Sequence, residues 1–320
     1  VLHGSPDAPA VDVDAVYVAD DLIDNLEYGS ATGYTPLPTG IYDLAVRAHD
    51  NPAVLATFRA NLGSEGAAFV FASGLLGGTP AFGLYAVFPD GTVAALPASP
   101  TARLQVIHNS PDPTVDVYVG NTRLIDNFAF RTATPFVTVL ADRPLSVGVA
   151  LDNSGSAADA IATFPVTLPE GGTFVAYASG VVGQTPAFDL IAVEGRESAV
   201  DVSKVELSVF HGSPDAPAVD VDAVLVAADL IDNLAYGNST GYVALSPAIY
   251  DLAIRAHDDP TVVATFRADI SSLTGGAAQV FASGFLASAP AFGIYVALPD
   301  GTVFPLPLSP APARVQIIHD

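Results

Sequence analysis

The sequence predicts an all-β protein built from three tandem antiparallel β-sandwich domains, followed by the first strand of a fourth. The letters HGSPDAPAVDVDA start at His3 and again at His211, and a looser version, HNSPDPTVDVYVG, starts at His108. Short runs rich in Val, Ile, Tyr, Phe and Thr are bounded by Gly, Pro, Asn and Asp, which is typical of strands joined by tight turns. No stretch combines a helical hydrophobic period with helix caps.

The repeats define the predicted domains. LIDNLEYGSATGY returns as LIDNFAFRTATPF and as LIDNLAYGNSTGY, in register with the histidine motif. The first and third repeats are nearly identical (odd-type), and the second is more distant (even-type). Repeats of this length exceed the ~20–50 residues of solenoid repeats, so each is expected to be an independent domain. The expected ranges are 1–100 (odd-type), 101–203 (even-type), 204–312 (odd-type) and 313–320, the first strand of a further repeat or a donated strand.

Each repeat is expected to contain the same strands in the same order. In the first, VDVDA alternates, and IYDLAVRA, VLATFRA and FVFASG each alternate or run apolar, as strands do. ADDLIDNLEY comes nearest to a helix, but its Asp-Asn interior argues against one. PDG at 89–91 marks a tight turn. About seven or eight short strands per hundred residues fit an immunoglobulin-like sandwich, with Tyr28, Tyr34, Phe58 and Phe82 expected in the core.

The charge balance narrows the classes of partner. The chain carries 34 Asp and Glu against 11 Lys and Arg, which argues against nucleic acid and against anionic membranes. It has no cysteine, hence no disulfide, no thiolate metal site and no thiol nucleophile. No apolar run reaches the ~18 residues of a membrane span, and no signal-peptide layout is present. The sequence is therefore expected to be a mature or excised piece.

The opening motif allows a catalytic interpretation and a structural one. His3, Ser5 and Asp7 could suggest a hydrolytic triad, but a triad usually draws its members from separate segments and needs an oxyanion hole. Pro6 follows Ser5 and removes a backbone N–H that could line such a hole. Ser-Pro-Asp is instead typical of a turn in which the carboxylate accepts local backbone N–H groups. We therefore expect no catalytic residues and no enzyme.

A calcium site is the more serious chemical alternative. Asp12 and Asp14 alternate with valines, so both carboxylates point to one face of a strand, and with Asp7, or with Asp20 and Asp21, they could supply oxygen ligands. The counterparts in the third repeat are Asp215, Asp220, Asp222 and Asp229. The second repeat has Tyr118 where a second aspartate would fall. Calcium, if bound, would therefore belong to odd-type repeats, and the competing interpretation is a solvated acidic face without a cofactor. His49 and His257 are less favoured transition-metal ligands.

The two ends carry strand sequences. ARVQIIHD, residues 313–320, matches ARLQVIHN, residues 102–109, where the second repeat opens. The simpler interpretation is one continuous polypeptide holding further repeats. The alternative is that this strand is donated to another molecule, completing the sheet that opens at Val1. The residues expected to take part in such self-association are Val1, Leu2, Arg314, Val315, Gln316, Ile317 and Ile318.

The motifs HGSPDAPAVDV, LIDNLAYGNSTGY and AIYDLAIRA resemble those of a prokaryotic family of domains of unknown function, DUF4397. In the second repeat, Phe130-Arg131 replaces the Tyr-Gly pair of the family's central motif, and Pro135-Phe136 replaces its Gly-Tyr pair. The resemblance implies sandwich domains used in tandem on secreted or cell-surface proteins, and it implies no activity. The expected function is an extracellular stalk, adhesin or filament, with neighbouring copies or further repeats as partners. The alternative is a cell-surface module that binds a carbohydrate or a protein.

Overall fold

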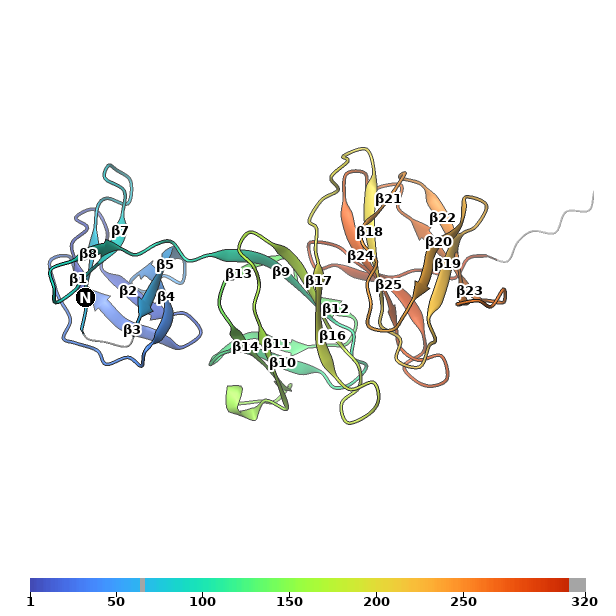
Figure 1. Cartoon of the computed structure of the whole chain (residues 1–320), viewed down its shortest axis with the longest axis horizontal. Helices are drawn as coiled ribbons and strands as arrows, with labels where there is room; N and C mark the ends of the chain where they lie inside the picture. Colours follow the sequence, from blue (N-terminus) through green and yellow to red (C-terminus); the bar gives the residue numbers. More distant parts are fainter. Residues whose placement is uncertain (64–66, 311–320) are drawn as a thin grey trace, which may run out of the picture. The chain divides into compact units, whose positions relative to one another are not determined.

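The computed structural model describes residues 1–63 and 67–310 and confirms the predicted fold class. Its strands form six small sheets that come in pairs along the chain, as tandem β-sandwiches do (Figure 1). In the described residues the helical structure is a single 3₁₀ turn, η1 (Ala157–Asp159). None of the helical structure described is long and apolar enough to cross a membrane.

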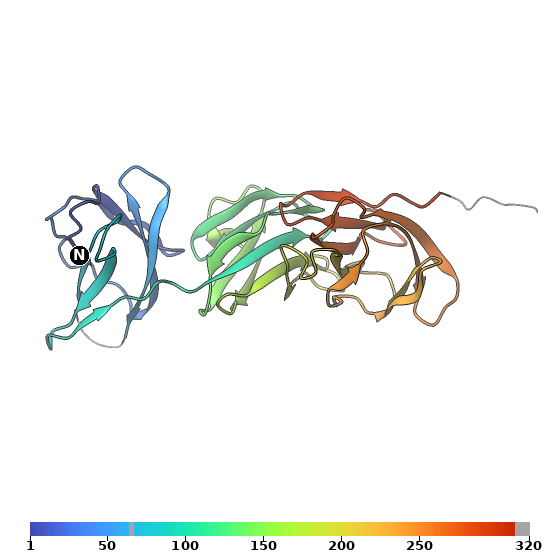
Figure 2. The ribbon, with the colours of Figure 1, turned by 90° about the horizontal axis from the view of Figure 1, so that it is seen from above.

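The first repeat folds into two four-stranded sheets, ordered β1-β6-β7-β8 and β3-β2-β4-β5. In Figure 2, β2–β5 in blue and β6–β8 in teal form two layers. Val11, Val13 and Ala15 alternate along β2, and all three are buried in the core between the layers. The strands are β1 (Leu2–His3), β2 (Val11–Ala15), β3 (Ala19–Leu26), β4 (Gly40–Ala48), β5 (Val54–Leu62), β6 (Phe69–Ser73), β7 (Gly83–Val87) and β8 (Val93–Ala95).

The second repeat supplies the sheets β11-β10-β14-β15 and β12-β9-β16-β17, with β13 also paired to β9. Its opening strand β9 runs parallel to β16, from Arg103 opposite Thr173 to His108 opposite Ala178. The strands are β9 (Thr101–His108), β10 (Val115–Val119), β11 (Thr122–Phe128), β12 (Thr132–Ala133), β13 (Val137–Leu140), β14 (Leu145–Leu151), β15 (Ala162–Val166), β16 (Thr173–Ser179) and β17 (Asp189–Glu194).

The third repeat has the strand order of the first with one added edge strand, β21, in sheets β21-β18-β24-β25-β26 and β20-β19-β22-β23. Its core includes Val205 and Leu207 from the opening strand, packed with Val280 and Ile294 from the same sheet and Val221 from the facing sheet. The strands are β18 (Val205–His211), β19 (Val219–Ala223), β20 (Ala227–Leu234), β21 (Val243–Leu245), β22 (Ile249–Ala256), β23 (Val262–Asp269), β24 (Ala277–Ser283), β25 (Gly293–Ala297) and β26 (Val303–Pro305).

The strand order within these sheets is distinctive. In an immunoglobulin constant domain the second strand shares a sheet with the first, fourth and fifth, and the third joins the last two. Here β2 and β3 pair directly, β2 also pairs β4, and the opening strand runs parallel to β6. The second sheet is therefore built from two successive hairpins, and the first sheet depends on a parallel pairing between residues far apart in the sequence.

By the density of contacts the chain divides into two compact units. Unit 1 holds residues 1–102, 116–126 and 140–171, and unit 2 holds residues 103–115, 127–139 and 172 onward. The division passes through the second repeat, since most of the sheet β11-β10-β14-β15 falls in unit 1 and most of the sheet β12-β9-β16-β17 in unit 2. The domain boundaries expected from the sequence stay a prediction, and the expected strand at 313–320 lies outside the described residues.

Two aromatic residues expected in the core of the first repeat are not there. Phe58 is 8% exposed, as expected for a core residue, but Tyr28 is 58% and Tyr34 79% exposed. The rings of Tyr28 and His3 are perpendicular to each other, with ring centroids 6.0 Å apart. Tyr34 lies on the rim of a cavity. The expectation was wrong because aromatic content alone does not reveal whether the space beside a ring is filled.

Candidate functional site

The histidine and serine of the opening motif hold the turn together. The His3 ring is buried, and its Nε2 lies 2.8 Å from the Pro9 carbonyl oxygen, while its Nδ1 accepts the Ser5 backbone N–H at 3.3 Å. The Ser5 hydroxyl donates to the Gly74 carbonyl across 2.7 Å. These bonds fit a neutral imidazole protonated at Nε2. The serine proton is therefore directed to a backbone carbonyl and not to the imidazole.

The same serine contact recurs in all three repeats. Ser110 donates to the Gly180 carbonyl at 2.8 Å, and Ser213 to the Gly284 carbonyl at 2.7 Å. Each acceptor glycine follows the strand that pairs with the opening strand, and each has a positive φ, which favours glycine. The motif thus fastens the opening turn to a loop about seventy residues away.

Asp7 is part of this turn and does not join the cluster formed by Asp12 and Asp14, the other predicted calcium ligands of the first repeat. Its carboxylate accepts the backbone N–H groups of Leu76 at 3.0 Å and Gly77 at 3.3 Å. These bonds, that from Leu76 foremost, lower the pKa of Asp7. In the third repeat Asp215 accepts from Leu286 and Ala287 in the same way. The third member of the motif therefore caps the loop that the serine also holds.

The buried histidine of the second repeat makes stability depend on pH. Burial lowers the pKa of His108 to about 4, from 6.5. Because the unfolded chain takes up this proton below pH 6.5 and the folded chain does not until about pH 4, His108 stabilises the fold above pH 6.5, and this stability is lost as the pH falls towards 4. We expect a loss of about 3 kcal/mol over this range. Urea unfolding of the wild type and of His108→Gln at several pH values measures it, and a difference between them that stays constant with pH would contradict it.

Asp12 and Asp14 share one face of β2, as their spacing predicts. Each accepts a hydrogen bond from the neighbouring strand β3 at a position where the strand pairing is irregular. Asp21 and Asn25 on β3 have positive φ angles, and the pairing register of β2 and β3 shifts there. Asp14 Oδ1 accepts the Asp21 N–H at 2.8 Å, and Asp12 Oδ1 accepts the Asn25 N–H at 2.8 Å. The aspartates therefore satisfy N–H groups that the bulged ladder leaves free.

Arg47 on β4 neutralises this acidic group. Its guanidinium donates to Asp12 Oδ2 at 2.7 Å and to Asp14 Oδ2 at 2.9 Å, and it also pairs with Asp21. Arg255 makes the same contacts with Asp220, Asp222 and Asp229 in the third repeat. The site predicted from the sequence did not include Arg47. In the paired strands β2 and β4, Arg47 lies directly opposite Asp12.

His49 completes the cluster. Its Nδ1 lies 2.9 Å from Asp12 Oδ1 and 3.5 Å from Asp24 Oδ1. The hydrogen bond to Asp12 and the surrounding carboxylates raise the pKa of His49. Burial raises the pKa of Asp12, but the bonds from Asn25 and His49 outweigh it and lower that pKa. Asp12, Asp24 and His49 could hold a metal ion, as could Asp220, Asp232 and His257, because one ligand atom from each lies within 4.8 Å of the others.

Calcium has to compete with Arg47 for the predicted ligands. We therefore expect neither a chelator nor added calcium to move the melting temperature of the wild type. In Arg47→Met the carboxylates of Asp12, Asp14 and Asp21 lose their cation, and added calcium should raise the melting temperature of that variant, since a ligand that binds the folded state stabilises it. Calorimetry with calcium or chelator measures both. A lower wild-type melting temperature in chelator would contradict the expectation.

The even-type repeat replaces this cluster with a smaller one. Asp116 pairs with Arg123 at 3.3 Å and accepts the Ser154 hydroxyl, and Tyr118 is within 2.9 Å of the same hydroxyl. Tyr118 stands where odd-type repeats have Asp14 and Asp222. In this smaller cluster one arginine, Arg123, thus pairs with Asp116 and with Asp126.

A second candidate site lies within unit 2, where the third repeat covers the sheet of β9 and β16. The ring of Tyr177 stacks on Phe210, with centroids 3.9 Å apart and planes inclined by 6°. Both residues are fully buried, and the Tyr177 hydroxyl donates to Gln279 Oε1 at 3.0 Å. Burial raises the pKa of Tyr177 well above its usual range. No sequence motif marks Tyr177 as a residue of a contact between repeats, because it looks like any other apolar residue of a predicted strand.

Polar side chains surround this stack. Gln105 donates to the Leu298 carbonyl at 2.8 Å, and Asn109 donates to the carbonyls of Gly212 at 3.3 Å and Ala282 at 3.0 Å. Arg131 donates to Ser283 and lies over the ring of Tyr295, 4.3 Å from its centroid. Buried aromatic rings surrounded by side chains that donate hydrogen bonds across the contact are typical of a specific interface.

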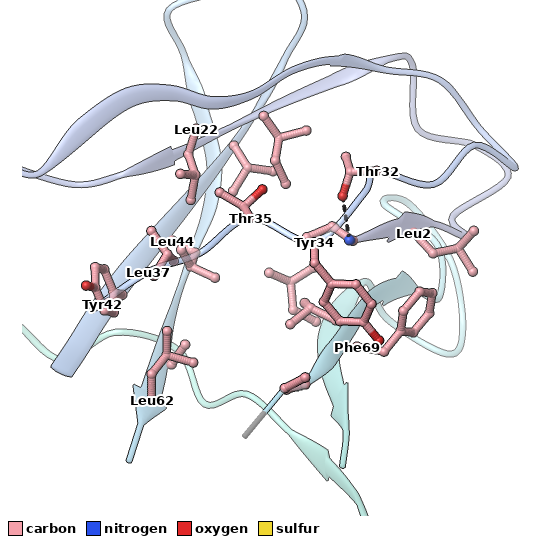
Figure 3. A pocket seen from close by; sticks show the side chains of 18 of the residues that line it. Leu2, Leu22, Thr32, Tyr34, Thr35, Leu37, Tyr42, Leu44, Leu62 and Phe69 are labelled. Carbon is pink, nitrogen blue, oxygen red and sulfur yellow. Dashed lines mark hydrogen bonds between the residues drawn. The ribbon is translucent and has the colours of Figure 1, made fainter. Parts of the chain in front are cut away.

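A third candidate site is a cavity of about 690 Å³ inside the first repeat. Leu22, Leu37 and Leu44 line it on one side, and Tyr34 and Phe69 lie together at its rim (Figure 3). Beside the rim, Thr32 accepts a hydrogen bond from the Val1 amino group at 2.8 Å. The corresponding core of the third repeat contains a cavity of about 60 Å³. Among the described residues the cavity of the first repeat is therefore the larger of the two.

Comparison with known proteins yields one family. Residues 1–96, 102–222 and 208–319 each match a family described as "Domain of unknown function (DUF4397)". No curated protein matches the chain.

Proposed function

The chain belongs to the DUF4397 family, whose description assigns no activity, and from this premise we propose that it is a structural protein and not an enzyme. Its tandem sandwiches form an extracellular stalk, adhesin or filament, and its partners are neighbouring copies or further repeats. The observation that carries the proposal is the buried contact of Tyr177 with the third repeat. A mechanical role requires that neighbouring repeats hold each other, and this contact provides the means.

The hydrogen bonds of the serine and histidine of the opening motif, the residues that most suggest catalysis, also support the proposal. In each repeat the serine of the opening motif donates to a backbone carbonyl about seventy residues away. Two histidines of the motif, His3 and His108, have both ring nitrogens within hydrogen-bond reach of backbone groups. A hydroxyl nucleophile needs a base beside it, whereas these groups are engaged in holding loops.

Electron microscopy of the native material tests the function. We expect filaments or surface projections with a repeating bead, and a sample that contains only short separate monomers would overturn the proposal. A glycan array and a cell-binding assay test the competing function, a ligand-binding module. Binding that survives when the assembled form is dispersed would favour the module.

A further inference from the structure

One turn of the central motif has the same backbone in the second and third repeats but a different residue at its left-handed position. The turn follows β11 in the second repeat and β20 in the third. The Arg131 N–H donates to the His108 carbonyl at 2.8 Å, and Arg131 has a φ of 65°. The Gly237 N–H donates to the His211 carbonyl at 2.8 Å, and Gly237 has a φ of 77°. The even-type repeat therefore places an arginine where the odd-type repeat places a glycine.

The arginine of this turn contacts the third repeat. Arg131 Nε donates to Ser283 Oγ at 3.0 Å, and its Nη2 donates to the Ala291 carbonyl at 2.8 Å. The guanidinium carbon lies 4.3 Å from the centroid of the Tyr295 ring and 4.5 Å from that of the neighbouring Phe130. The guanidinium is therefore held by a tyrosine ring and by two oxygen atoms of one face of the third repeat.

The turn of the third repeat contacts the corresponding place on the second. Alignment of YASG with FASG and of AFDLI with AFGIY shows that Ser179 and Ile191 are the counterparts of the serine and the tyrosine that Arg131 contacts. The Tyr236 hydroxyl lies 3.2 Å from Ser179 Oγ. A Cβ atom at Gly237 would lie 3.6 Å from Ile191 Cδ1. Contacts that are returned at corresponding positions are those of a two-fold pair.

The position of Tyr295 distinguishes the two types of repeat. Odd-type repeats have a tyrosine there, Tyr85 and Tyr295, whereas the even-type repeat has Ile191. A guanidinium is attracted to the face of an aromatic ring and gains no such attraction from an aliphatic side chain. The arginine of the even-type turn therefore meets the tyrosine of the odd-type face, and the glycine of the odd-type turn meets the isoleucine of the even-type face.

The backbone of the turn also points to a function of the Arg131 side chain. A positive φ costs arginine free energy that it does not cost glycine, because a Cβ atom then crowds the following carbonyl oxygen. The odd-type repeats have glycine at this position, Gly29 and Gly237, with φ angles of 79° and 77°. A bulky residue held in a conformation that favours glycine suggests that its side chain has a role.

We infer that Arg131 is a specificity-determining residue, which makes the second repeat bind an odd-type repeat at this face and not another even-type repeat. The partner is recognised by the tyrosine at the position of Tyr295, since the serine beside it is common to both types. Specificity is a difference between two binding free energies, and here a ring is compared with an isoleucine. The inference deepens the proposed function and rests on it only in that the chosen neighbour would be a link of the same stalk.

A double-mutant cycle in the whole chain tests the inference. Arg131→Gly, Tyr295→Ile and the double variant are unfolded in urea and followed by circular dichroism. Each replacement is the residue that the other type of repeat has at that position. We expect the two substitutions to couple by about fivefold to thirtyfold in the unfolding equilibrium constant, the range of a cation–π contact. Additive effects of the two substitutions would overturn the inference.

Two further variants separate recognition of the ring from general packing. Tyr295→Phe keeps the ring, so Arg131→Gly should lower stability as much in that background as in the wild type. A smaller effect of Arg131→Gly in the Tyr295→Phe background would overturn the inference. Tyr295→Leu takes the place of Tyr295→Ile in the cycle should the latter not fold.

Tyr85→Ile is the matched control, because it makes the same change at the corresponding tyrosine of the first repeat. We expect its effect on the unfolding equilibrium constant to add to that of Arg131→Gly, since the guanidinium lies over Tyr295. Coupling of Arg131→Gly with Tyr85→Ile as strong as with Tyr295→Ile would overturn the inference.

The result is separable from the test of the proposed function. Coupling between positions 131 and 295 in material that forms only separate monomers would retain the specificity and remove the filament. Filaments in electron micrographs, together with additive effects in the cycle, would leave the proposed function standing and remove the role of Arg131.

Discussion

Replacing Tyr177 with alanine is expected to lower the free energy of unfolding of unit 2 by about 3–5 kcal/mol, the usual cost of deleting a buried aromatic ring. The ring is fully buried, and it stacks on Phe210 and packs edge to face with Phe281. Its removal leaves a cavity between the second and third repeats and leaves Gln279 Oε1 without the hydroxyl that donates to it. Urea unfolding followed by circular dichroism measures the change.

Two variants separate the parts of this effect. Tyr177→Phe keeps the ring and removes the hydroxyl, so we expect about 1–2 kcal/mol from the unpaired Gln279 oxygen. Phe71→Ala changes the corresponding position of the first repeat, where the ring stacks on Tyr85 and is only partly buried. We expect a smaller loss there than for Tyr177→Ala. Equal losses of unfolding free energy at the two positions would show that the contact between repeats adds nothing to stability.

Asp43→Asn is expected to destabilise unit 1 by about 3–5 kcal/mol, because it breaks a buried ion pair and leaves cations behind. The Asp43 carboxylate is fully buried, and it accepts from Arg59 at 2.9 Å and from Arg143 at 2.6 Å. Burial raises the pKa of Asp43, but the bonds from Arg59 and Arg143 outweigh it and lower that pKa. Thermal and urea unfolding of the variant measure the loss.

The third repeat provides the matched control. Asp251 occupies the position of Asp43, but its side chain is 35% exposed and it pairs with one arginine, Arg267, which is 41% exposed. Solvent screens such a pair, so Asp251→Asn should cost only a small part of what Asp43→Asn costs. A similar loss for both variants would mean that the second arginine and the burial are without effect.

The fold class was predictable from the sequence because periodicity and turn residues act locally. The alternation of VDVDA placed the two aspartates of β2 on one face, as the structure confirms. The strand order was not predictable in this way, since the parallel pairing of β9 and β16 joins residues about seventy positions apart. A pairing between residues so far apart in the chain produces no pattern in the local sequence.

The candidate sites were predictable only in part, for a similar reason. Acidic residues at alternate positions suggest cation ligands, and the motif alone does not reveal that Arg47 is already the cation. Asp7 looks like a third ligand by proximity in sequence, but its carboxylate is bound to the loop at Leu76. Exposure depends on what lies across a space, which explains why Tyr34 was expected inside and is found at the rim of a cavity.

The hydrogen bonds of Asn109 have a consequence for the residue at position 212. A Cβ atom at Gly212 would lie 2.0 Å from Asn109 Nδ2 and 2.9 Å from the Ala282 carbonyl oxygen. A side chain at position 212 would therefore displace the Asn109 amide from the carbonyls of Gly212 and Ala282 that it binds. The glycine of the third repeat's opening motif thus leaves the space in which the second repeat's asparagine is held.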